Sequence, residues 1–250
     1  FLYTLLNLTQ EGNFKAARYS LISADEVVIA NSNEEEYRRF LSSSGNEALG
    51  SRLFVIPVQY TLQVSREVRV YQKLLAASNN EKHTAPGTLY AAALFSVQTR
   101  LYPSKRKGMN LVKKARIYDG EQIDGFTSGD ILELMNEFPG EGMTGIDPRF
   151  IINVLAAAIT TPNISCVNGF YILQRLEKAV LNELSMSNRD KERYCELLED
   201  ARQYYQETSM MHFRAICLKY HESEAQKLFN QYLQQVKLYC QGQRSDEELM

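Results

Sequence analysis

Two apolar runs between residues 25 and 60 constrain the possible fold more than any other feature of the sequence. DEVVIA predicts a strand over 25–30, and RLFVIPV predicts a second strand over 52–58. The segment between them is polar, rich in glutamate and arginine, and predicts a helix over 33–43. A strand, a helix and a strand in this order indicate part of an α/β fold.

Polar residues stand at the two places in this segment where a ligand could be reached. Asn33 follows the first predicted strand, at the sheet edge where open α/β folds bind ligands. Arg52 opens the second predicted strand, and a guanidinium presents a fixed fork of donors to phosphate oxygens. Together the two residues favour a phosphate ligand, although Asn33 taken alone is better explained as the N-cap of the helix that follows it.

Several segments are distinctive in their order and spacing: TQEGNF (9–14), IANSNEEEY (29–37), NEALGSRLFVIPVQYTLQVSREVRVYQKLL (46–75), HTAPGTL (83–89), RIYDGE (116–121) and EGMTGIDPRF (141–150). Together they closely resemble the PrkA family of bacterial serine protein kinases. Members of that family carry an AAA+ ATPase module followed by a helical PrkA domain. The resemblance runs from about Thr9 to the end of the chain.

This resemblance implies a mostly helical fold with a small α/β portion. Residues 1–60 would be the C-terminal part of an AAA+ P-loop core. Residues 61–161 would form the α-helical lid of that module, and residues 162–250 an α-helical C-terminal PrkA domain.

The spacing of apolar residues predicts where the helices of this chain lie. A helix over 1–10 is expected to lead into a turn or hairpin around 13–24. A long helix over 189–220 is expected to break near Ser209. The remaining helices are predicted over 64–75, from Pro86-Gly87 onward, over 127–138, from Asp147-Pro148 to Pro162, over 167–184 and over 223–241.

Three residues acquire specific roles through the resemblance. Asn33 corresponds to the sensor-1 residue, which orients the water that attacks the γ-phosphate. Arg52 corresponds to an arginine finger that acts in trans on the nucleotide of a neighbouring subunit. Arg149, in the first turn of its helix, corresponds to the sensor-2 residue that contacts ATP phosphates, because a helix N-terminus and a guanidinium together attract anions. An ordinary ion pair is the simpler alternative for either arginine.

Two further patterns favour structural explanations. Gly140, Gly142 and Gly145 have the spacing G-x-G-x-x-G, but they follow a predicted helix rather than a strand, so they predict a flexible elbow before the helix of Arg149. A basic run over 105–116 could bind an acidic substrate, another subunit or nucleic acid. Few aromatic residues are interleaved with it, and a solvated loop and helix face is therefore favoured. The run comprises Lys105, Arg106, Lys107, Lys113, Lys114 and Arg116.

Composition limits the partners. The net charge of −2 makes nucleic acid an unlikely ligand, and no apolar run is long enough to span a bilayer. Four widely spaced cysteines fit a reduced, cytoplasmic protein. The histidines are scattered, and Cys217 with His221 would supply only two ligands, so no metal site is assigned in this chain. A protein substrate and further copies of the chain are the expected partners.

The function implied by the resemblance is ATP-dependent phosphorylation of proteins in stress and starvation responses. The sequence contains no G-x-x-x-x-G-K-[ST] motif. The strand that ends in paired acids and binds magnesium is expected to lie before Phe1. We therefore expect an internal fragment that is inactive alone, with ATP and Mg²⁺ bound mainly by residues outside it. H-R-D and D-F-G motifs are also absent, so the kinase activity rests on resemblance. An ATP-dependent protease or unfoldase, and a non-catalytic protein-interaction module, stay as alternatives.

Overall fold

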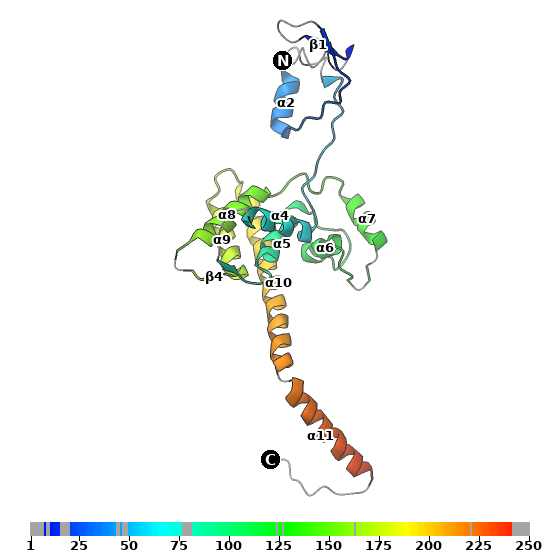
Figure 1. The fold of residues 1–250 in the computed structure, drawn as a ribbon, viewed down its shortest axis with the longest axis vertical. Coiled ribbons are helices and arrows are strands. Elements are labelled where there is room, and N and C mark those ends of the chain that lie inside the picture. Colours follow the sequence, from blue (N-terminus) through cyan, green and yellow to red (C-terminus); the bar gives the residue numbers. More distant parts are fainter. Residues whose placement is uncertain are drawn as a thin grey trace. The chain divides into compact units, whose positions relative to one another are not determined.

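The computed structural model describes residues 8, 11–15, 21–43, 46, 50–76, 82–123, 125–126, 128–162, 164–220 and 222–241. The chain divides into two compact units, Phe1–Pro57 and Val58–Met250 (Figure 1). Helices dominate, as predicted, and strands are few and short. The helix predicted over 1–10 lies almost wholly outside the described residues.

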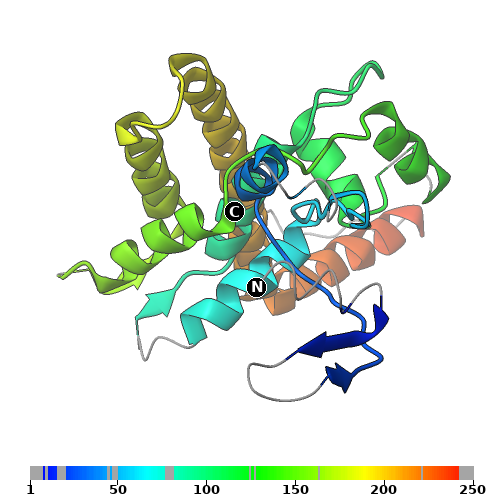
Figure 2. The ribbon, with the colours of Figure 1, turned by 90° about the horizontal axis from the view of Figure 1, so that it is seen from above.

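The described residues of the first unit include a hairpin and the helix α2. Strands β1 (Asn13–Lys15) and β2 (Leu21–Ser23) pair antiparallel, with Asn13 opposite Ser23, and are the dark blue arrows in Figure 2. Helix α2 (Glu34–Ser42) follows and carries three glutamates in its first turn, where the helix dipole favours negative charge. The hairpin and the helix confirm the predictions for 13–24 and 33–43.

The strands predicted over 25–30 and 52–58 are not formed. Residues 25–30 and 53–58 have no regular secondary structure, and their apolar side chains are exposed: 91% for Ile29 and 89% for Phe54. A strand is stable only when neighbouring strands satisfy its backbone groups and cover its side chains. Neither run has such a neighbour among the described residues. The prediction of two strands was therefore wrong, because strand formation depends on a neighbouring strand, which a local sequence pattern cannot supply.

The second unit is a helical assembly with one short parallel bridge. Strand β3 (His83–Thr84) pairs with β4 (Cys166–Val167), two segments far apart in the sequence. The helices are α4 (Val64–Ala76), α5 (Thr88–Arg100), α6 (Leu111–Tyr118), α7 (Ser128–Glu137), α8 (Pro148–Thr160), α9 (Gly169–Asn182), α10 (Asn188–Tyr220) and α11 (Glu222–Cys240).

Helix α5 is the centre of the core. Every residue from Ala91 to Arg100 is buried, and the helix packs against α4, α6, α8, α9 and α10 (Figure 1). A helix with apolar residues on all sides is expected to be buried, and its alanines let the neighbouring helices approach closely. The polar residues near its C-terminal end, including Arg100, are therefore carried into the interior.

Helices α8 and α10 show how local sequence sets helix ends. Asp147 is the N-cap of α8 and Pro148 occupies the first turn, as predicted. Helix α10 continues through Ser209, so the predicted break there is wrong. The segment contains neither proline nor glycine, and a serine alone does not end a helix. Among the described helices, none is long and apolar enough to cross a membrane.

Candidate functional site

Arg149 lies in the first turn of α8 with its side chain exposed. The Asp147 carboxylate caps the helix, because its Oδ1 accepts a hydrogen bond of 2.7 Å from the Arg149 backbone N–H. The positive end of the helix dipole and the guanidinium therefore act at the same place. An anionic group such as a phosphate is the chemistry that this arrangement favours.

The turn that leads into α8 is closely packed. Gly145 has a φ of +122°, and a Cβ added there would lie 2.7 Å from Cγ of Arg100. Gly142 has a φ of +81°, donates its N–H to Arg100 O at 3.1 Å, and accepts from the Tyr60 N–H at 2.9 Å. The glycines form the turn before α8, as predicted, and Gly142 and Gly145 are needed there for left-handed backbone and close approach.

A buried ion pair between Arg100 and Glu67 holds the turn before α8 in place. The Arg100 guanidinium is fully buried and contacts both carboxylate oxygens of Glu67, at 2.8 Å and 3.0 Å. The same guanidinium donates to Ile146 O at 3.2 Å, directly before the N-cap of α8, and to Thr61 O at 2.9 Å. Because one rigid fork reaches all three partners, it fixes the start of α8 relative to α4 and α5.

Tyr60 covers this ion pair on the side of Asp147. The Cζ of Arg100 lies 4.9 Å from the centre of the Tyr60 ring, a cation–π contact. The Tyr60 hydroxyl points at Asp147 Oδ2, 3.4 Å away. Burial and the nearby Asp147 carboxylate raise the pKa of the Tyr60 hydroxyl, so it stays protonated and able to donate.

Sequence reasoning missed the roles of Glu67 and Arg100. A signal for Glu67 exists, because it lies three residues after Val64 and four before Tyr71, both of which belong to the buried face of α4. An acid on an apolar stripe implies a buried partner. The identity of that partner is not encoded locally.

The basic run over 105–116 is only partly solvated. Lys105, Lys107 and Lys113 are exposed, as expected. Lys114 is fully buried and contacts Glu141 at 2.5 Å, and Glu141 also accepts from the Tyr118 hydroxyl at 2.9 Å. The interpretation as a solvated face is therefore wrong for Lys114, whose ammonium group is buried against Glu141. Arg106 and Arg116 are half-buried and paired, with Asp130 at 2.8 Å and with Glu121 at 2.6 Å respectively.

Asn33 and Arg52 belong to the first unit, whereas Arg149 belongs to the second. Asn33 caps α2, since its Oδ1 accepts a hydrogen bond of 2.7 Å from the Glu36 backbone N–H. Arg52 is exposed and lies in a turn in which the Leu53 N–H donates to Gly50 O. The amide of Asn33 thus performs the capping task that its local sequence favoured.

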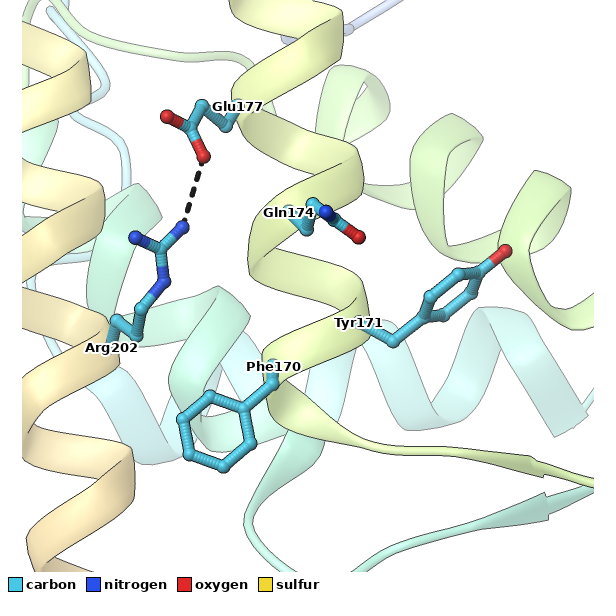
Figure 3. A pocket seen from close by; sticks show the side chains of 5 residues that line it. All are labelled: Phe170, Tyr171, Gln174, Glu177 and Arg202. Atoms are coloured by element: carbon cyan, nitrogen blue, oxygen red, sulfur yellow. Dashed lines mark hydrogen bonds and ion pairs between the residues drawn. The ribbon is translucent and has the colours of Figure 1, made fainter.

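An open depression lies between α9 and α10 (Figure 3). It is lined by Phe170, Tyr171, Gln174, Glu177 and Arg202. Glu177 on α9 reaches across it to Arg202 on α10, at 2.9 Å. This pair joins two helices and offers no nucleophile. In the part of the chain that the structure describes, no group of three or more His, Cys, Asp or Glu side chains could hold a metal ion.

Comparison with known proteins gives matches over nearly the whole chain. Residues 1–108 match the PrkA AAA domain, and residues 112–249 match the PrkA serine protein kinase C-terminal domain. The chain is 44% identical to a Bacillus subtilis (strain 168) protein named ATP-dependent protease PrkA, over 96% of its own length. It is 28% identical to an Escherichia coli (strain K12) protein named serine/threonine kinase YeaG, over 97% of its length. It spans 38% of the length of each relative, and no solved structure matches it.

Proposed function

The chain belongs to the PrkA family, and from this premise we propose that it is the lid-bearing part of an ATP-driven enzyme that acts on proteins. The observation that carries the proposal is the placement of Arg149. Its guanidinium is exposed at the positive end of α8, above a turn fixed by the Arg100–Glu67 pair. An exposed cation at a helix N-terminus suits the γ-phosphate of ATP, because catalysis of phosphoryl transfer depends on positioning and charge.

ATP, with Mg²⁺ bound, would supply the energy of phosphoryl transfer. The residues of this chain would contribute a phosphate contact from Arg149 and a lid whose position responds to it. Asn33 and Arg52 are proposed to act from the first unit, Asn33 on the attacking water and Arg52 on the nucleotide of a neighbouring subunit. That last role requires a homo-oligomer.

The reaction at the protein substrate has two candidates. Phosphorylation of serine is our first, because the C-terminal family model and the relative YeaG both carry the name of a kinase. Proteolysis is the second, and it is favoured by the higher identity, 44% against 28%, of the relative named as a protease. Both share the ATP-driven step proposed for Arg149.

The ATP-driven step is tested in the full-length protein with Arg149→Ala. Arg189→Ala is the matched control, since Arg189 is also exposed in the first turn of a helix, α10. We expect Arg149→Ala to weaken ATP binding and lower steady-state ATP hydrolysis while the control leaves both unchanged. Equal hydrolysis by the two variants would remove Arg149 from the nucleotide site.

The two substrate reactions are separated by one incubation with casein. With ATP radiolabelled in its γ-phosphate, a kinase transfers the labelled phosphoryl group to casein, releases ADP and leaves the length of casein intact, whereas a protease produces shorter peptides without label. Each activity should fall with Arg149→Ala. Casein that is neither labelled nor shortened, with ATP hydrolysis intact, would leave ATP-driven remodelling as the function.

A further inference from the structure

We infer that Tyr60 is a positioning residue for Arg149, which ties the point where the chain enters the helical unit to the helix that carries Arg149. This inference rests on the proposed function, since it concerns how Arg149 meets a nucleotide phosphate. It begins from the exposure of the chain on either side of Tyr60. Val58 is 86% exposed and Leu62 only 8%, so Tyr60 marks the entry into the packed core.

Tyr60 makes three contacts of different kinds, two with the segment before α8 and one with the end of α5. Its backbone N–H donates to Gly142 O at 2.9 Å. Its ring lies over the guanidinium of Arg100, 4.9 Å from the ring centre. Its hydroxyl faces Asp147 Oδ2 at 3.4 Å. The first two contacts hold the ring in place, and the third reaches the N-cap.

Asp147 is shared between Tyr60 and Arg149. One carboxylate oxygen faces the Tyr60 hydroxyl, and the other accepts the Arg149 backbone N–H at 2.7 Å. The orientation of this carboxylate therefore depends on both partners. The hydroxyl contact is longer than the usual O–H···O distance of about 2.7–2.8 Å, so a small displacement of Tyr60 breaks it and leaves Asp147 Oδ2 without this partner.

The consequence is a coupling between the linker and the phosphate contact. When the residues before Tyr60 shift, Asp147 loses one partner, the cap of α8 loosens, and the backbone that carries Arg149 is held less firmly. Conversely, an anion held by Arg149 stabilises the arrangement in which Tyr60 contacts Asp147, because coupling between two sites is reciprocal. Tyr60 would thus report nucleotide occupancy to the segment that precedes it.

The test uses the full-length protein and two readouts. Tyr60→Phe keeps the ring over Arg100 and removes only the hydroxyl. Tyr90→Phe is the matched control, since the Tyr90 hydroxyl also faces a carboxylate, Glu121, at 3.5 Å in a half-buried place. Hydrogen exchange in nucleotide-free protein follows the amides of the first turn of α8. Equilibrium titration with a fluorescent ATP analogue and Mg²⁺ measures binding.

We expect Tyr60→Phe to speed exchange at Arg149 and Phe150 and to weaken nucleotide binding about fivefold, at the lower end of ordinary coupling between sites. Asp147→Ser keeps a capping oxygen but is too short to reach Tyr60. It should also speed exchange in the first turn of α8 and weaken nucleotide binding. Tyr90→Phe should change neither readout. Added to Arg149→Ala, Tyr60→Phe should weaken binding no further, because it acts through Arg149.

Two results overturn the inference in distinguishable ways. If Arg149→Ala weakens nucleotide binding but Tyr60→Phe matches Tyr90→Phe in both readouts, the positioning role is wrong and the proposed function stands. If Arg149→Ala itself leaves nucleotide binding unchanged, the proposed role of Arg149 fails and the role of Tyr60 fails with it.

Discussion

Replacement of Glu67 by glutamine offers the sharpest test of the buried ion pair. The change is nearly isosteric, so it removes charge without opening a cavity. Glu67 is 1% exposed, and its carboxylate accepts from Arg100, from the Tyr71 hydroxyl at 2.8 Å and from the Ser96 hydroxyl at 3.3 Å. After the substitution, the guanidinium of Arg100 keeps its positive charge in a place that water does not reach.

The loss of stability is set by the buried charge of Arg100, which no longer has a carboxylate partner. Removing one partner of a buried pair typically destabilises a protein by about 3–5 kcal/mol. In a unit of this size, 1 kcal/mol lowers the melting temperature by roughly 2–4 °C. Glu67→Gln should therefore lower the melting temperature of the helical unit by roughly 10 °C.

The assay is thermal unfolding followed by circular dichroism, with urea unfolding as a second measure. Glu199→Gln is the control, because it breaks an ion pair with Arg202 whose glutamate is 65% exposed, and such pairs contribute at most about 1 kcal/mol. Adding Arg100→Met to Glu67→Gln removes the stranded cation and should recover part of the loss. Equal melting temperatures for Glu67→Gln and Glu199→Gln would refute the reasoning.

Three further predictions concern the nucleotide site and the turn. Arg52→Ala in the full-length protein should lower ATP turnover by about a thousandfold while ATP binding persists. Mixing this variant with a P-loop-lysine mutant should restore ATP turnover. A mixture that assembles but stays inactive contradicts action in trans. The 250-residue chain alone should show no sub-micromolar ATP binding by calorimetry, because it has no P-loop motif. Gly145→Ala should destabilise the helical unit by about 1–3 kcal/mol in urea, since its Cβ would approach Cγ of Arg100 to 2.7 Å; unchanged stability would contradict the close packing.

The sequence determined most of the helices and several of their ends, because these depend on residues within one or two turns; the break predicted near Ser209 and the unpredicted helix α6 are the exceptions. The N-caps at Asn33 and Asp147 and the proline at 148 act on backbone groups next to them. The resemblance in sequence likewise sufficed for the family, and therefore for the expectation of a nucleotide-binding module. The predicted site residues Asn33, Arg52 and Arg149 remain predictions about the role of each side chain.

The tertiary structure alone decided which charges are buried and which apolar runs are strands. Glu67 meets Arg100, 33 residues away, and Lys114 meets Glu141, 27 residues away, so no local pattern identifies the partner of either charge. The runs at 25–30 and 52–58 have strand-forming sequences, yet they form no strand with any described residue, because a strand depends on hydrogen bonds from a neighbouring strand. The backbone hydrogen bonds of a helix form within one segment, whereas strand pairing and the burial of a charge require partners distant in sequence.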